Sequence, residues 1–304
     1  MFELSLNIPD NNNKKYGKSR RRVALRKALS QVKYPSEFKR RSRQTLDYKH
    51  FKGAEFRNLG LFAFHIIAEM FPPGSEVRRL WIMTGYILRI NLLDDEDYIE
   101  ARADTKVPIT EIYRRWMRTY EDLFGKEAMV HNIHMFYHLQ IARKLGPFWS
   151  TSLFREESSY GRLQKRFRSG TTNVGKQGMM NYLYSEMVMG HTDVRYPRFN
   201  TKKLAQTDDS IMYLANGDFV KLVATDTKEE ATKYYVKRFI TRAYRPDECA
   251  YLTFTKVQVR RVISLNEEEE ELDIADPRQR VTAKGIHAKN LLLAIPNGIL
   301  MEEL

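Results

Sequence analysis

Three histidines lie close together in residues 130–146, and their spacing suits metal binding. His131, His134 and His138 follow one another at intervals of three and four residues, which places them on one face of a helix. Imidazoles at this spacing can share one Zn²⁺, although zinc normally takes four ligands, or three and a water. The chain has a single cysteine, Cys249, so it has no cysteine pair to complete such a site. The alternative is that these are packed helix histidines hydrogen-bonded to their neighbours.

Two adjacent acids are followed by a basic run. Glu156 and Glu157 precede the segment 162–177, RLQKRFRSGTTNVGKQ. Carboxylates hold divalent metals and the following cations bind phosphate, so the order suits metal-assisted phosphate chemistry. Basic residues interleaved with aromatic ones also suit contacts to a nucleic-acid backbone and its bases. The alternatives are acids that favour a helix dipole and an ordinary amphipathic helix with Leu163 and Phe167 toward the core.

Positive charge is concentrated near the start of the chain. Among the 304 residues, 51 Lys or Arg and 38 Asp or Glu give a net charge of +13. Residues 1–45 carry 13 of these cations and 3 acids, a balance of +10. Such a block attracts DNA, RNA or an acidic protein. The pairing of Lys14–Lys15 with Arg20–Arg22 is also typical of a nuclear import signal, and a solvated basic tail is the plain alternative.

Several classes of protein are disfavoured. The basic cluster follows the first apolar residues, which is the wrong order for a secretory signal. The longest apolar stretch, residues 59–70, contains His65 and Glu69 and is too short to span a bilayer. No P-loop, dinucleotide, hydrolase or kinase signature is present, and Cys249 has no histidine partner at a family spacing. We expect an intracellular protein without a membrane partner.

Apolar periodicity predicts helices over most of the first half. Residues 1–33 are expected to form a partly disordered basic arm. Within it, a short basic helix is expected over 19–32, and Pro35 stops this helix. Residues 34–147 are predicted to form an all-helical domain. Its expected elements are a linker and helix ending before Pro72, then helices 76–92, 109–124 and 130–145, the last two stopped by Gly125 and Gly146. The acidic run 94–97 is interpreted as the exposed end of a helix.

The period changes to that of strands after residue 209. A helix is expected over 154–168, within an irregular segment 148–200. Asn216-Gly217 between two apolar runs predicts a hairpin, and further short strands follow within 201–304, which we expect to form a small β barrel. The acidic run 266–276 is interpreted as a solvated hairpin loop. The fold class predicted is therefore α+β and multidomain.

An ordered series of short motifs runs through these segments. It consists of Pro-Ser-Glu-Phe (35–38), Lys-x-x-Glu-Phe-Arg (52–57), Asn-x-His-x-x-x-His-Leu (132–139), Gly-Pro-x-Trp (146–149) and Phe-x-x-Glu-Ser-x-x-Gly-x-Leu (154–163). In order and approximate spacing, residues 34–300 resemble the C-terminal half of CACTA-type (En/Spm) DDE transposases, including their domesticated relatives. The final β segment also resembles the small module that ends many of these proteins.

The resemblance implies roles for named residues. Such transposases have an RNase H-like core, interrupted by a helical insertion, in which three carboxylates hold two Mg²⁺ or Mn²⁺ ions. Glu157 matches the third acid, with Glu156 as the alternative shifted by one residue. His134 and His138 match a histidine pair that, with an upstream cysteine pair, holds Zn²⁺ in the insertion. The basic helix that follows would lie beside the DNA backbone through Arg162, Lys165, Arg166 and Arg168.

The departures from the family pattern limit the activity expected. The first two acids should lie on strands upstream, where Asp10 is the sole aspartate, and the cysteine pair is missing. We therefore expect the remnant of an RNase H-like core, without strand-transfer activity by itself, in a nuclear protein that binds DNA. A complementary chain would have to carry the missing acids. The alternative is a protein-interaction module with a basic nuclear-import arm.

Overall fold

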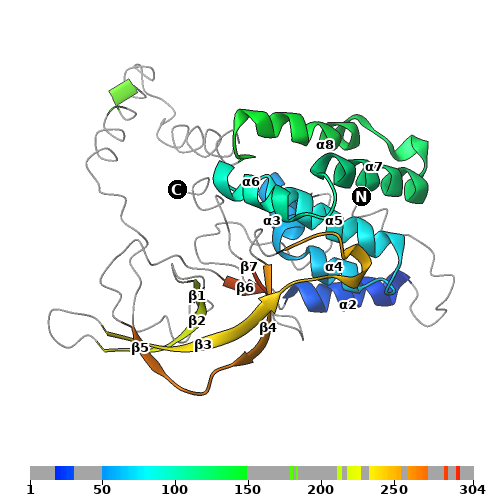
Figure 1. Ribbon diagram of the computed structural model, residues 1–304. Helices are drawn as coiled ribbons and strands as arrows, with labels where there is room; N and C mark the ends of the chain where they lie inside the picture. Colours follow the sequence, from blue (N-terminus) through cyan, green and yellow to red (C-terminus); the bar gives the residue numbers. More distant parts are fainter. Residues whose placement is uncertain are drawn as a thin grey trace, which may run out of the picture.

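The computed structural model describes a helical part and a β-sheet part (Figure 1). The described residues are 18–30, 50–148, 179–180, 183, 211–213, 218–226, 233–254, 259–272, 284–286 and 292–294. The helical part comprises α2 (Lys18–Ser30), α3 (Gly53–Phe62), α4 (Phe64–Glu69), α5 (Glu76–Ile90), α6 (Asp95–Asp104), α7 (Ile109–Phe124) and α8 (His131–Ala142), with short 3₁₀ turns at η2 (Lys126–Ala128) and η3 (Arg143–Leu145). No described helix is long and apolar enough to cross a membrane.

Helix α5 lies at the centre of the helical part. It contacts α3, α4, α7 and the short turn η5 (Asp247–Cys249), so apolar residues occupy most of its circumference. Ser75 caps it by accepting a hydrogen bond from the Arg78 N–H at 3.4 Å, and Glu76 in the first turn favours the helix dipole. Thr84 accepts a 2.8 Å hydrogen bond from the buried Trp116 indole of α7. The helix predicted over 76–92 is thus confirmed, ending two residues earlier.

The predicted single helix before Pro72 is two helices. The backbone leaves helical geometry at Ala63 (φ −112°, ψ 3°), which separates α3 from α4. This turn brings the Phe64 ring against Gly85 of α5, where a Cβ atom would lie 2.2 Å from the ring Cγ. Because no side chain at position 85 intervenes, the ring reaches the backbone of the central helix.

Helix α6 was not predicted from the sequence. The acidic run is exposed at Asp94, Asp95 and Glu96, as expected for the end of a helix. This end is the amino end of α6, with Asp94 as its N-cap residue. Acids in a first turn interact favourably with the positive end of the helix dipole. Helix α7 lies between Pro108 and Gly125 as predicted, and Gly125 ends it with a left-handed φ of 82°.

The β part is an antiparallel sheet. Its strands are β1 (Ile211–Tyr213), β2 (Phe219–Asp226), β3 (Lys233–Ala243), β4 (Val259–Leu265), β5 (Glu270–Leu272), β6 (Lys284–Ile286) and β7 (Leu292–Ala294). The order is β1-β2-β3-β4-β7-β6, with β5 paired to β3. Tyr213 lies opposite Phe219 in the β1–β2 hairpin, as predicted, while its Asn-Gly turn is outside the described residues.

Two predictions for the β part need correction. The strands at the two ends of the sheet order, β1 and β6, approach each other but no strand pairing is described between them, so the sheet is not closed and a barrel is not confirmed. The acidic run is not only a loop, because Glu270–Leu272 forms β5. Arg238 of β3 explains this, since its guanidinium pairs with the Glu270 carboxylate at 2.7 Å and also with Asp218.

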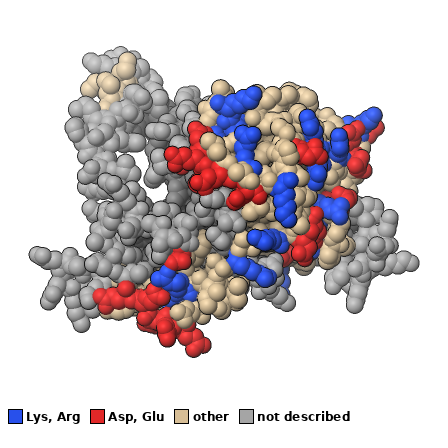
Figure 2. Space-filling model, viewed as in Figure 1, with Lys and Arg blue, Asp and Glu red and all other residues tan. Residues whose placement is uncertain are grey.

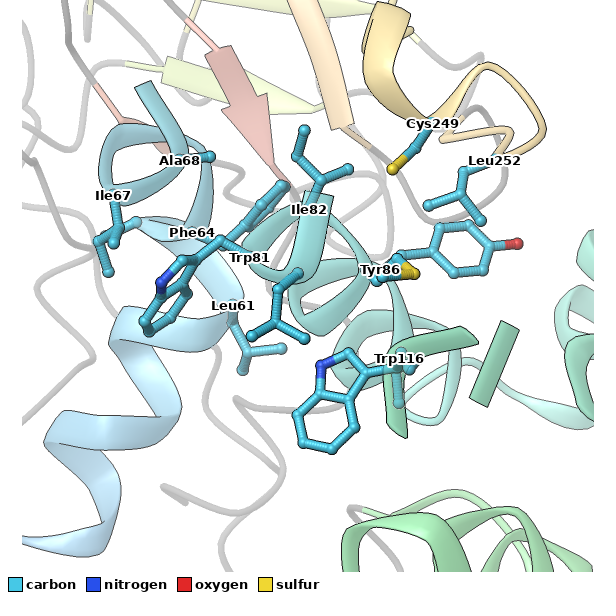
Figure 3. Close-up of a cluster of buried hydrophobic side chains, with 14 of the residues drawn as sticks. Leu61, Phe64, Ile67, Ala68, Trp81, Ile82, Tyr86, Trp116, Cys249 and Leu252 are labelled. Atoms are coloured by element: carbon cyan, nitrogen blue, oxygen red, sulfur yellow. The ribbon is translucent and has the colours of Figure 1, made fainter. Parts of the chain in front are cut away.

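The segment between β3 and β4 packs into the helical part. Phe254 is fully buried, stacks on Phe64 with ring centroids 5.8 Å apart, and meets the Tyr86 ring edge-on at 5.2 Å. Figure 3 shows Cys249 and Leu252 beside Tyr86. These residues belong to the same hydrophobic core as α3, α4, α5 and α7. The helical and β parts therefore share one core at this segment.

Candidate nucleic-acid interface

The acids and the basic run predicted at 156–168 lie outside the described residues. This applies to Glu156 and Glu157. It applies equally to Arg162, Lys165, Arg166 and Arg168. Their assignment to catalysis and DNA contact, and the RNase H-like remnant they would belong to, stay predictions.

The histidine pair is brought together on α8. The Nε2 atoms of His134 and His138 lie 3.0 Å apart, and their ring centroids are 4.7 Å apart. In such a hydrogen bond one ring nitrogen donates and the other accepts, with the roles set by the tautomer of each ring. His131 begins the helix one turn earlier. Within the described residues no three His, Cys, Asp or Glu side chains gather as metal ligands, so the pair supplies half of a zinc ligand set.

Helix α2 carries the basic block as a docked element of the fold. Leu25 is fully buried and Leu29 is 6% exposed, both within the core, and α2 packs against α4. The short helix predicted within residues 1–33 is confirmed, and its described residues dock on the helical part through these two leucines. The i, i+4 spacing of the two leucines gives α2 one apolar stripe, and that stripe fixes its orientation.

The charged residues on the solvent side of α2 are all cationic. The helix has six Lys or Arg residues and no acid, and Arg22, Arg26 and Lys27 are exposed. Arg22 and Arg26 are one turn apart, so like charges repel each other along the helix. A bound polyanion would relieve this repulsion.

Acidic side chains gather elsewhere on the surface. Figure 2 shows them at the edge of the helical part near α6 and along the sheet near β5. Among the described residues, the group near α6 contains Asp94–Asp97 and the group near β5 contains Glu267–Glu271. Helix α2 itself contains no acidic residue, so a polyanionic ligand would meet only cationic charges along this helix.

Cys249 is not a nucleophile in this fold. It is the last residue of η5 and is fully buried, and burial raises the pKa of its thiol to about 12. A thiol must be ionised and accessible to react. The residue acts as a small apolar group in the shared core.

No family model matches the chain, and no curated protein and no solved structure matches it either.

Proposed function

We propose that this protein is a transposase-derived, non-catalytic DNA-binding protein that acts in the nucleus. The observation that carries the proposal is the docked helix α2, whose exposed face is cationic and whose position is fixed by Leu25 and Leu29. Charges held on a folded surface contact phosphates with less ordering cost than charges on a free tail. Such contacts position a protein on a duplex without reading sequence. The resemblance to CACTA-type transposases supports DNA as the polyanion.

We further propose that these 304 residues do not cleave DNA alone. The resemblance supplies one acid of three, Glu157, and one carboxylate does not hold two Mg²⁺ or Mn²⁺ ions. A second chain carrying the other acids would be needed for strand transfer. Nicking of a supercoiled plasmid by the purified chain with Mg²⁺ or Mn²⁺, abolished by Glu157→Ala, would overturn this part of the proposal.

The DNA-binding test neutralises α2 without removing it. The perturbed protein carries Arg22→Gln, Arg26→Gln and Lys27→Gln, all on the exposed face. The control carries the same loss of three charges at Lys106, Arg118 and Lys126, which are exposed and lie outside α2. Affinity for a fluorescently labelled duplex is measured by anisotropy across a series of salt concentrations, and circular dichroism verifies that both variants fold.

The salt dependence gives the size of the expected effect. Three phosphate contacts contribute about 2.7 to the slope of log K against log salt, which makes binding about 40-fold weaker on going from ~50 to ~200 mM. We expect the α2 variant to lose this part of the slope and the control variant to keep it. Equal slopes for the two variants would show that α2 is not the interface, whatever their affinities.

A second candidate is a protein-interaction module with a basic nuclear-import helix. Exposed apolar side chains along α8 and η3 favour it, since Met135, Ile141 and Leu145 are 47%, 53% and 79% exposed. An apolar interface depends weakly on salt, because few counterions are released when it forms. Absence of duplex binding together with salt-insensitive self-association or partner binding, lost in Leu145→Ser, would favour this candidate over the first.

A further inference from the structure

A groove opens between α6, the start of α7 and the end of α8. It encloses about 620 Å³, and a smaller hollow that shares Ile99, Arg102 and Ile109 continues it. These three helices form the upper part of the helical domain in Figure 1, whereas α2 packs against α4 in its lower part. The volume is that of a site for a small organic ligand.

Cations outnumber acids in the groove. Arg102, Arg143 and Lys144 line it, with Asp95 as the acid among its lining residues. Asp95 is already paired with Arg143 at 2.8 Å. Arg102 and Lys144 are exposed and have no ion-pair partner in the described part of the chain. Two positive charges therefore remain for a ligand.

Arg143, one of the cations that line the groove, is fixed by several contacts. It is 4% exposed, donates from Nη2 to the Leu93 carbonyl at 2.9 Å, and lies 4.3 Å from the centre of the Tyr98 ring. Its Nε atom is buried and has no hydrogen-bond partner within the described residues. A buried guanidinium with a donor left over is unfavourable by itself, and a nearby anion would compensate for it.

The amino end of α7 adds a second source of positive potential. Pro108, Ile109 and Thr110, which begin α7, line the groove. No side chain caps this end of the 16-residue helix. The Pro108 carbonyl accepts from the Glu111 N–H at 2.9 Å, whereas the N–H groups of Ile109 and Thr110 have no hydrogen-bond acceptor among the described residues. Backbone N–H groups and the helix dipole favour an anion at such a position.

The remaining walls are apolar. Ile99 and Ile141 line the groove and are 65% and 53% exposed, and Pro108 and Ile109 complete this side. We infer that the groove binds a small amphipathic anion, which places a phosphate or carboxylate group among Arg102, Lys144 and the α7 amino end and an apolar body against the isoleucines. This site is separate from the DNA-binding surface proposed on α2.

The test uses three matched probes on the full chain. Isothermal titration calorimetry measures octyl phosphate, octanol and inorganic phosphate. Octyl phosphate is expected to bind with one-to-one stoichiometry and at least about tenfold more tightly than either of the other two, because each lacks one half of the interaction. Equal affinity for octanol would refute the anion site, and equal affinity for inorganic phosphate would refute the apolar wall.

Substitutions locate the binding. Arg102→Gln and Lys144→Gln remove exposed charges, so both variants should fold, and each is expected to weaken octyl phosphate about threefold to fivefold. Octanol binding should not change in these variants. Arg118→Gln, an exposed change on α7 outside the groove, is the control and should leave octyl phosphate affinity unaltered. No saturable binding of octyl phosphate at about 1 mM, or equal weakening in the control, would overturn the inference.

Discussion

Replacing Gly85 by alanine should destabilise the protein, although helix propensity favours the opposite. In the middle of a helix, alanine is about 1 kcal/mol more favourable than glycine. Gly85 lies in the middle of α5 and faces the Phe64 ring. An alanine Cβ would lie 2.2 Å from the ring Cγ and 2.5 Å from both Cδ atoms, so the ring or α5 must move by more than 1 Å to reach an ordinary contact of about 3.5 Å.

The Phe64 ring has little room to move. Phe254 stacks on it with an interplanar angle of 11°, and Tyr244 meets it edge-on at 6.3 Å. Inserting a methyl group into such a core lowers the free energy of unfolding by about 1–3 kcal/mol. For an overlap of this size we expect a loss near the upper end of that range. After subtracting the propensity gain, we expect Gly85→Ala to lower the free energy of unfolding by about 2 kcal/mol.

Gly60→Ala is the matched control. A Cβ there would meet the Leu88 Cδ1 at 2.4 Å, but Leu88 is half-buried and its next atom is 3.9 Å away, so rotation of this flexible side chain removes the overlap. Urea denaturation followed by circular dichroism gives both unfolding free energies. We expect Gly60→Ala to be unchanged or up to about 1 kcal/mol more stable. Equal unfolding free energies for Gly85→Ala and Gly60→Ala would contradict the tight packing of residues 244–254 against α4 and α5.

Three further predictions concern α2, Cys249 and the histidine pair. Leu25→Ala should lower the free energy of unfolding by about 2–4 kcal/mol in urea denaturation, since Leu25 is fully buried, whereas Val23→Ala, at a 60% exposed position, should change it by less than about 0.5 kcal/mol. Cys249 in the folded protein should react with a thiol reagent at pH 8 about a thousandfold more slowly than after unfolding, because its pKa is raised from 9.0 to about 12; fast reaction without denaturant would contradict this. Tag-free protein should contain far less than one zinc per chain by elemental analysis, because His134 and His138 supply two of four ligands; stoichiometric zinc lost on substituting either one would contradict this.

Local signals predicted α5, α7 and the β1–β2 hairpin. The start and end of α7 follow from Pro108 and Gly125, which restrict the backbone on either side of a strongly amphipathic segment. The β1–β2 pairing follows from the Asn-Gly turn signal. The contact between His134 and His138 follows from helix geometry alone. Each of these features depends on residues fewer than twenty positions apart.

The features that local sequence patterns do not predict depend on contacts between residues far apart in the chain. The ion pair of Arg143 with Asp95 joins positions 48 residues apart, so neither the anchoring of α6 nor the charged groove could be predicted from spacing. Burial of Cys249 and Phe254 in the helical core depends on a segment that returns from the sheet. The spacing of Leu25 and Leu29 predicted an apolar stripe, but periodicity does not say which surface covers it.

Because α2 packs against the helical core, deleting the amino-terminal residues is a poor test of DNA binding. Removing residues 1–33 would take the charges away, but it would also remove Leu25 and Leu29 from the core and expose the surface of α4 beneath them. Loss of DNA binding after such a deletion would therefore follow equally from a lost interface and from a damaged fold. Neutralising Arg22, Arg26 and Lys27 leaves the buried stripe intact, so a change in salt dependence then reports on phosphate contacts alone. An intact fold with an unchanged salt slope would direct attention to the basic run at 162–177 as the remaining candidate.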